Sequence, residues 1–227
     1  MKKGSVVLKV FALIIVALVV TLFVYNVSHK PEVSRDVWNV AMTKGDPDNE
    51  NYFVEYTDMF CPYCANFNRA MGANFDRDYI ETDKVFFEMR LTALIADHSE
   101  NSQRGNETAY CAARQEKFWT YYDAVLEKLY EDYHSKGIGV SKVSPQIPKL
   151  DDSYYFDVAS FVGLDVENMK KCLSDGDALK ELATNTEKAA RTLPSGVPHI
   201  VVNDYTSSGF DGDYSTIKMI LKAGGVE

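Results

Sequence analysis

The sequence predicts an α/β fold in which a small sheet is interrupted by a long helical insertion and preceded by a transmembrane helix. Apolar runs rich in aromatic and β-branched residues at 52–56, 84–91 and 197–203 are typical of buried strands. A helical pattern lies between the first two runs, which makes a βαβ unit with parallel pairing. Roughly 100 residues with helical spacing then separate the second run from the third.

These patterns divide the chain into four segments. We expect a cytoplasmic stub and membrane anchor at 1–30, the first part of the sheet domain at 31–92, the helical insertion at 93–191 and the second part of the sheet domain at 192–227. No internal repeat or low-complexity tract is visible.

Composition narrows the class of protein. Among 227 residues, 46% are hydrophobic and 25% are charged, as in an ordinary folded domain and unlike a disordered or collagen-like chain. The formal net charge is −9, and the 33 acidic side chains all lie after residue 30. Because binding to nucleic-acid phosphates needs a basic face, no nucleic-acid partner is expected.

The N-terminal segment has the pattern of a membrane helix. Residues 10–25 are apolar except for Thr21, and extension to 6–27 with Lys9 reaching the interface gives the length needed to span a bilayer. Lys2 and Lys3 precede this run, so the positive-inside rule places the N-terminus in the cytoplasm and residues 31–227 outside. That compartment permits disulfides.

A cleaved signal peptide is the alternative to an uncleaved anchor. The flank at 25–29 reads Tyr-Asn-Val-Ser-His and offers no pair of small residues for a signal peptidase. The flank therefore favours the anchor.

In the first half of the outer domain, residues 37–41 are expected to form a short strand and residues 45–49 a turn. The strand at 52–56 reads as buried on both faces. A helix at 65–79 follows, with Phe67, Met71 and Phe75 four residues apart, and the strand at 84–91 completes the unit.

The second half is mostly helical. Aromatic and apolar residues have helical spacing over 107–133, and a loop rich in Gly, Ser and Pro follows at 135–148. Asp165 is a candidate N-cap. The remaining predicted elements are helices at 153–161, 167–173 and 178–191, a strand at 197–203, a turn at 208–212 and a closing helix at 214–221.

The candidate chemistry lies in the motif Cys61-Pro62-Tyr63-Cys64. A Cys-x-x-Cys pair can bind a metal, but a tetrahedral site normally needs a second pair of Cys or His at similar spacing. Cys111 and Cys172 are isolated from each other, so no metal site is expected. Thiol–disulfide exchange fits better, and an inert structural disulfide stays open as the alternative.

The position of the motif favours exchange. Pro62 is suited to the first turn of a helix, which places Cys61 at the helix N-terminus, where backbone N–H groups stabilise a thiolate. Cys64 lies deeper in the first turn and is expected to be more shielded. We therefore expect Cys61 to be the nucleophile and leaving group and Cys64 to resolve the mixed disulfide.

Two further residues stand out. Glu55 lies in an apolar strand, so burial is expected to raise its pKa and let it shuttle the proton of Cys64; a strand-edge Glu that reaches solvent is the alternative. Pro198 cannot donate to a sheet ladder, so it is expected at an edge or strand start, where it leaves a neighbouring edge free to pair with substrate.

These residues resemble a family, the DsbA-like thiol oxidoreductases of the thioredoxin superfamily. Three stretches carry the resemblance: FVEYTDMFCPYC at 53–64, YCAA with KFW at 110–119, and GVPHIVVN at 196–203. The resemblance covers residues 37–223. It implies a thioredoxin fold interrupted by a helical domain, with a cis-proline at Pro198 facing the Cys61–Cys64 pair.

The resemblance also implies roles for neighbouring residues. Val197, before the proline, resembles the oxidase branch, and Val197, Pro62 and Tyr63 are expected to contact substrate. Tyr63 is a departure, because the strongly oxidising members have His there, and Cys-Pro-Tyr-Cys also occurs in glutaredoxins. Some family members pair two cysteines in the inserted domain, which implies a structural Cys111–Cys172 disulfide.

The expected function is therefore that of a membrane-anchored enzyme that introduces disulfides into reduced, unfolded exported proteins. It needs no cofactor beyond its redox-active disulfide, and the resemblance suggests a quinone-linked membrane protein as its electron acceptor. A reductase or isomerase of the same fold is the first alternative, motivated by Tyr63. A non-catalytic binding protein with a locked disulfide is the second.

Overall fold

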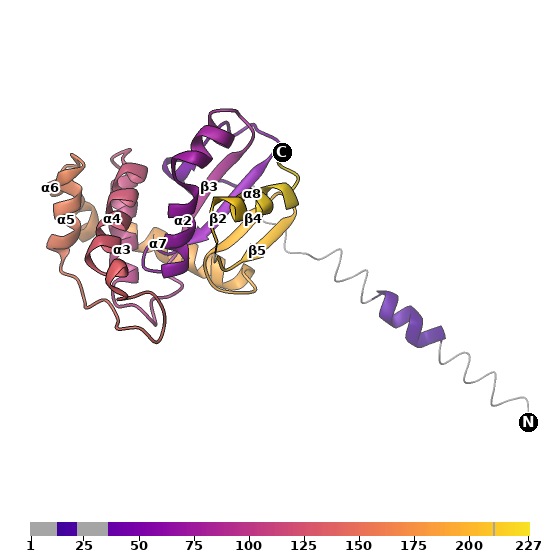
Figure 1. The fold of residues 1–227 in the computed structure, drawn as a ribbon. Coiled ribbons are helices and arrows are strands. Elements are labelled where there is room, and N and C mark those ends of the chain that lie inside the picture. Colours follow the sequence, from indigo (N-terminus) through magenta and orange to yellow (C-terminus); the bar gives the residue numbers. More distant parts are fainter. Residues whose placement is uncertain (1–12, 22–35, 211) are drawn as a thin grey trace, which may run out of the picture. The chain divides into compact units, whose positions relative to one another are not determined.

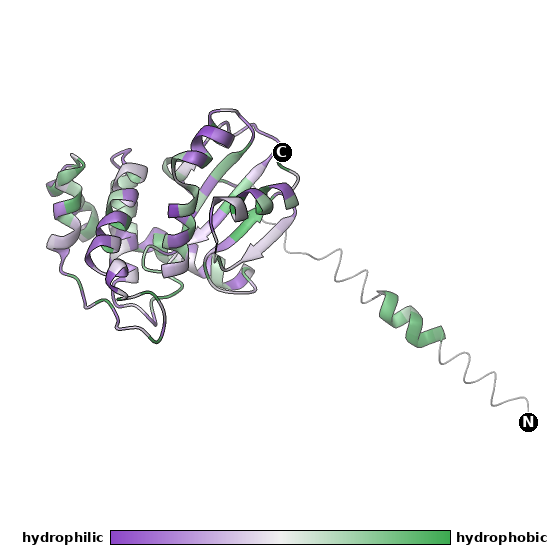
Figure 2. Ribbon diagram, in the orientation of Figure 1, coloured by the Kyte–Doolittle hydropathy of each residue, from purple (hydrophilic) through white to green (hydrophobic). Residues whose placement is uncertain are grey.

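The computed structural model describes residues 13–21, 36–210 and 212–227, in two compact units, 1–35 and 36–227. In the first unit, residues 13–21 form a helix with exposed, hydrophobic side chains (Figure 2). The rest of the predicted anchor at 6–27 lies outside the described residues. Within the described ranges, no helix has both the length and the apolar character needed to cross a bilayer.

The second unit is built around a mixed five-stranded sheet (Figure 1). The strand order is β1-β3-β2-β4-β5, with β2 and β3 parallel and the other neighbours antiparallel. The strands are β1 (Thr43–Lys44), β2 (Tyr52–Thr57), β3 (Phe86–Leu91), β4 (His199–Val202) and β5 (Tyr205–Ser208). The central strand β2 is fully buried, as its continuous apolar run predicts.

Helix α2 (Pro62–Phe75) joins β2 to β3 and packs on one face of the sheet through aromatic side chains. Phe53 of β2 contacts the Phe67 and Phe75 rings of α2 edge-on. A π-helical turn, Asp76–Ile80, follows α2. Gly72 kinks α2 with a φ of 45°, a backbone conformation that glycine adopts without strain. Helix α8 (Tyr214–Ala223) contacts α2 and closes the fold (Figure 1).

The opposite face of β2 and β3 carries a buried ion pair. Arg90 donates to Glu88 at 2.7 Å and to the Tyr56 hydroxyl at 2.8 Å, and its guanidinium lies 4.6 Å from the centre of the Trp38 ring. The backbone N–H of Trp38 donates to Glu88 at 2.6 Å. This network ties the segment before β1 to the sheet.

Five α-helices and a short 3-10 helix, His134–Lys136, lie between β3 and β4 in the chain. The α-helices are α3 (Ser102–Ala113), α4 (Phe118–Asp132), α5 (Asp152–Phe161), α6 (Val166–Asp175) and α7 (Asp177–Thr192). The Asp165 side chain accepts a hydrogen bond from the Asn168 N–H, so the predicted N-cap of α6 is confirmed. A disulfide joins Cys111 of α3 to Cys172 of α6. Two helices that are distant in sequence are thereby linked within the insertion.

Two predicted elements differ from the structure, and one strand was not predicted. Residues 37–41 are not a strand: the Asn39 side chain accepts from the Ala41 N–H and caps a 3-10 turn at Val40–Met42. The stretch at 107–133 is divided between two helices. Helix α3 ends at Ala113 and α4 begins at Phe118, and Glu116 between them has a φ of 58°, which a continuous helix does not allow. The strand β5 was not predicted, because its residues are hydrophilic (Figure 2) and mostly exposed at the sheet edge.

Replacing both Cys111 and Cys172 with Ala should lower the free energy of unfolding by about 4 kcal/mol, because the disulfide spans 61 residues and restricts the unfolded chain. Urea denaturation without reductant, followed by circular dichroism, measures the change. The double variant C61A/C64A is the matched control and should lose much less stability, since its two positions are only three residues apart. A loss below about 1 kcal/mol in the C111A/C172A variant would contradict the prediction.

Candidate active site

The Cys61-Pro62-Tyr63-Cys64 motif lies at the start of α2, immediately beyond the end of β2. Cys61 is the N-cap residue and Pro62 occupies the first turn, where its missing N–H leaves no helical hydrogen bond unmade. The Ala65 N–H donates to the Cys61 carbonyl at 3.0 Å and begins the helix. Cys61 is 4% exposed and Cys64 is 0% exposed, and both are free thiols.

The two thiols differ in their proton affinity. The pKa of Cys61 is lowered, chiefly by a hydrogen bond from the Cys64 thiol and further by the backbone N–H groups of Cys64 and Tyr63, against the opposing effect of burial. Burial raises the pKa of Cys64 well above its usual range, and the neighbouring Cys61 and Glu55 charges raise it further. A thiolate therefore forms on Cys61 in preference to Cys64.

The loop before β4 faces Cys61. The Val197–Pro198 peptide bond is cis, and the Cys61 thiol donates to the Val197 carbonyl at 3.4 Å. Pro198 immediately precedes the first residue of β4, and its carbonyl accepts from the Gly209 N–H at 2.9 Å. Val197 and Pro198 are thus brought to the reactive sulfur from more than 130 residues along the chain.

Glu55 lies in the middle of the central strand, between Met89 on β3 and Ile200 on β4. It is fully buried, so the alternative of a strand-edge carboxylate in solvent is wrong. The Asn68 side chain of α2 donates to Glu55 Oε1 at 3.1 Å. Burial raises the pKa of Glu55 to about 8, so its carboxyl group changes protonation state near neutral pH.

Asp58 is a site residue that sequence reasoning missed. It is fully buried beside the motif and accepts hydrogen bonds from the Ser102 hydroxyl, the Asn106 amide and the Phe60 N–H. Its carboxylate thereby joins the turn before Cys61 to the start of α3. Its charge also raises the pKa of Cys61, against the effect of the helix N-terminus. The sequence signal that could have identified Asp58 is its position, since it is an acidic residue directly after a buried strand.

A groove of about 980 Å³ opens beside Cys61. Its apolar lining includes Ile95, Ile147 and Val197, and Tyr63 stands at its wall with 48% of its surface exposed. Cys61 belongs to the lining of this groove although little of it is exposed, whereas Cys64 is fully buried and does not line it.

His199 follows Pro198 but does not join the thiols. Its Nδ1 lies 2.8 Å from the Ser208 hydroxyl, and its ring contacts the Tyr56 ring on the face of the sheet that carries Arg90. Among residues 13–21, 36–210 and 212–227, no group of three His, Cys, Asp or Glu side chains is arranged to hold a metal ion.

Comparison with known proteins places this geometry in a family. A profile described as thioredoxin matches residues 39–223. A Bacillus cereus protein named "Probable disulfide bond formation protein D" is 22% identical over 221 residues, with 94% of each chain covered.

Two solved structures share the fold. Wolbachia pipientis alpha-DsbA1 superposes with a TM-score of 0.62 at 17% identity, covering 81% of this chain and 90% of that one. Oxidised BdbD from Bacillus subtilis gives 0.59 at 19% identity, covering 81% and 91%. The resemblance found in the motifs is confirmed: the chain belongs to the thioredoxin family, as a DsbA-like thiol:disulfide oxidoreductase.

Proposed function

We propose that the protein is a membrane-anchored oxidase that introduces disulfides into reduced, unfolded exported proteins. The observation that carries this proposal is the asymmetry of the two thiols: Cys61 has a lowered pKa at the helix N-terminus, and Cys64 has a raised pKa in full burial. A stabilised Cys61 thiolate is a good leaving group, and its stability in the reduced protein makes the disulfide more oxidising.

The reaction begins with the Cys61–Cys64 disulfide. A substrate thiolate attacks Cys61 Sγ, the bond to Cys64 breaks, and Cys64 leaves and takes a proton from Glu55. A second substrate thiolate then attacks the substrate sulfur of the mixed disulfide, and Cys61 leaves as a thiolate. The substrate loses two electrons as its disulfide forms, and the enzyme gains them as it is reduced.

Substrate contacts are proposed from the groove and the cis-proline loop. The Val197 carbonyl lies 3.4 Å from the Cys61 sulfur, so an extended peptide bound along this loop would bring its own sulfur to Cys61. Tyr63 is exposed beside the sulfur, and Pro62 lies at the same helix start. We assign these contacts to the chain segment that flanks the substrate cysteine.

The cellular setting is proposed from the sequence. The apolar run at 6–27, with Lys2 and Lys3 before it, favours an anchor that leaves the catalytic domain outside the membrane. The reduced enzyme then needs an electron acceptor, for which we propose a quinone-linked membrane protein. The name of the Bacillus cereus relative, a disulfide bond formation protein, agrees with the oxidative direction.

An extracytoplasmic reductase is the second candidate, and Asp58 favours it. The charge of this buried carboxylate raises the pKa of Cys61, which weakens the thiolate and with it the oxidising power of the disulfide. Asp58 only reduces the lowering of the Cys61 pKa, which the Cys64 thiol and the helix N-terminus still produce on balance, so the reductase is the second candidate.

The reduction potential of the Cys61–Cys64 pair distinguishes the two candidates. For the full chain in detergent, equilibrated with glutathione buffers, we expect a value of about −120 to −180 mV, the range of disulfide donors. A value near about −270 mV, that of thioredoxin, would contradict the oxidase and support the reductase. The C61A variant should lose oxidation of a reduced, unfolded substrate, and retained activity would exclude the mechanism.

Replacing Glu55 with Gln should stabilise the protein in a pH-dependent way. Below the ordinary carboxyl range, both the folded and the unfolded state are protonated at residue 55, and the variant should match the wild type. As the pH rises to about 8, the unfolded chain ionises while folded Glu55 keeps its proton, so only the wild type loses stability.

Urea unfolding of E55Q and wild type between pH 4 and pH 9 measures this difference (roughly the range between the ordinary and the raised pKa). The exposed residue Glu81 provides the control variant E81Q, for which no such pH dependence is expected. A constant difference between E55Q and wild type across this range would show that Glu55 ionises normally.

A further inference from the structure

Glu55 and Cys64 share a buried polar pocket whose atoms are incompletely hydrogen-bonded. Glu55 Oε2, the Thr57 hydroxyl and the Tyr122 hydroxyl are buried and have no hydrogen-bond partner in the described part of the chain. The charges of Glu55 and Cys64 both raise the pKa of Tyr122, after burial, which places its hydroxyl near the pair. Since buried polar atoms are usually paired, this pocket is organised for something other than stability.

The two oxygens of Glu55 differ in their surroundings. Oε1 accepts a hydrogen bond from Asn68 Nδ2 at 3.1 Å, whereas Oε2 has no partner in the described chain. The same Asn68 amide donates to the Cys64 carbonyl at 3.0 Å. Asn68 lies one helical turn after Cys64, so a single side chain fixes the carboxyl group relative to the thiol that it serves.

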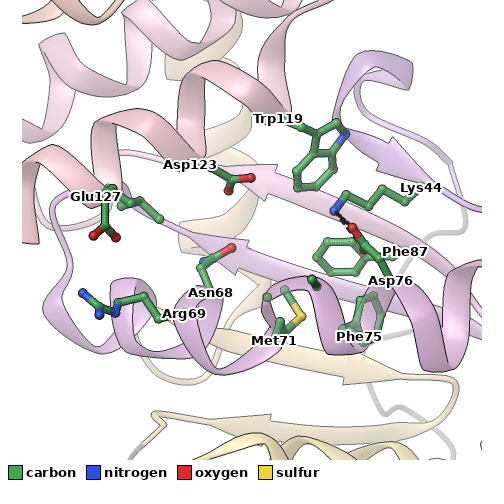
Figure 3. Close-up of a pocket in the computed structure, with 13 residues that line it drawn as sticks. Lys44, Asn68, Arg69, Met71, Phe75, Asp76, Phe87, Trp119, Asp123 and Glu127 are labelled. Atoms are coloured by element: carbon green, nitrogen blue, oxygen red, sulfur yellow. Dashed lines mark hydrogen bonds and ion pairs between the residues drawn. The ribbon is translucent and has the colours of Figure 1, made fainter. Parts of the chain in front are cut away.

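Asn68 also lines an open cavity of about 460 Å³ between α2, α4 and β3. Figure 3 shows Asn68 rising from α2 into this cavity, with Asp123 of α4 on the opposite wall. Partial desolvation there raises the pKa of Asp123, although its side chain remains exposed. The Lys44–Asp76 ion pair and the side chains of Arg69 and Glu127 complete the charged lining.

Asn68 therefore stands between buried Glu55 on one side and the cavity on the other. The titratable groups that act on Glu55 and its pocket are Cys61 and Cys64 from α2, Tyr122 from α4 and Asp58 after β2. The strand neighbours Met89 and Ile200 carry no charge. The Thr57 hydroxyl on the same strand also lies close enough to Glu55 to lower its pKa, while Asn68 makes the hydrogen bond to Oε1.

We propose that Asn68 is the positioning residue for proton transfer between Cys64 and Glu55, and that the α2–α4 cavity is the side from which this pair exchanges protons with solvent. The inference rests on the proposed function, because it describes the same thiol pair. Asn68 holds Oε1, and Oε2 is left to accept the Cys64 proton. When Cys64 attacks a mixed disulfide at Cys61, the Cys61–Cys64 bond forms, the other sulfur leaves as a thiolate, and Glu55 takes the proton.

The test isolates this step with oxidised glutathione. Reduced full-length protein attacks it through Cys61, and Cys64 then resolves the mixed disulfide, releasing the second glutathione. Acid quenching and mass spectrometry give the resolution rate from pH 5 to pH 10. In the wild type we expect an inflection near the Glu55 pKa of about 8, and in E55Q we expect its loss.

The variant N68L keeps the side-chain size but removes the amide. Since the Asn68 hydrogen bond favours the ionised carboxylate, its loss should move the inflection upward by about one pH unit. Asn66, exposed on the same helix, provides the control N66L, which should leave the inflection in place. In an E55Q background N68L should have no further effect. An unmoved inflection, or an equal rate loss with and without Glu55, would overturn the positioning role.

The cavity is tested by N68A, which also removes the hydrogen bond but opens the wall to water. Its inflection should shift as in N68L, while N68L should resolve the mixed disulfide at least roughly threefold more slowly, because leucine seals Glu55 from the cavity. Equal rates for N68A and N68L would overturn the cavity as the exchange side. If the wild type forms no mixed disulfide, the proposed function itself fails, and the two failures are thus distinguishable.

Discussion

The buried Cys64–Glu55 pair is the constraint around which the sheet domain is organised. Burial opposes ionisation of both groups, raising the pKa of the thiol and that of the carboxyl group. The Glu55 charge raises the pKa of Cys64 further, so ionisation of both groups at once is strongly disfavoured. Enclosure of the pair requires a central strand beneath it and the first turn of α2 above it, which is the arrangement of β2 and α2.

The helical insertion is coupled to this pair through Asp58. Its carboxylate accepts from Ser102 and Asn106 of α3 and from Phe60 in the turn that precedes Cys61. Tyr122 of α4 also lies close enough for the charges of Glu55, Cys64 and Asp58 to raise its pKa. A movement of the insertion relative to the sheet would therefore change the surroundings of the site.

Local sequence signals were sufficient for the parts of the fold that local interactions determine. The buried run of β2, the proline at the start of α2 and the Asp165 cap all act within a few residues, and each was predicted. The 3-10 turn at Val40–Met42 was missed because a single capping side chain, Asn39, outweighed strand propensity. Strand β5 was missed because it depends on pairing with β4, which no property of its own polar residues indicates.

The site shows the same division. The Cys-x-x-Cys motif identified Cys61 and Cys64, and a charged residue in an apolar strand identified Glu55. The cis bond at Pro198 followed only from family resemblance. Asp58 and Asn68 are ordinary polar residues in sequence. Their hydrogen bonds reach partners 44 and 13 residues away in the sequence, and these contacts form only in the folded chain.

The redox behaviour of Cys61 then follows from competition between neighbours and not from the Cys-x-x-Cys motif alone. The Cys64 thiol and the N–H groups of the first turn favour the thiolate, while burial and Asp58 oppose it. The Tyr63 side chain has 48% of its surface exposed, and it is the backbone N–H of Tyr63 that lowers the pKa of Cys61. A change of the residue at position 63 would therefore act on the reduction potential mainly through any charge or hydrogen bond its side chain adds to the sulfur, whereas a change at Asp58 would remove an opposing charge already in place.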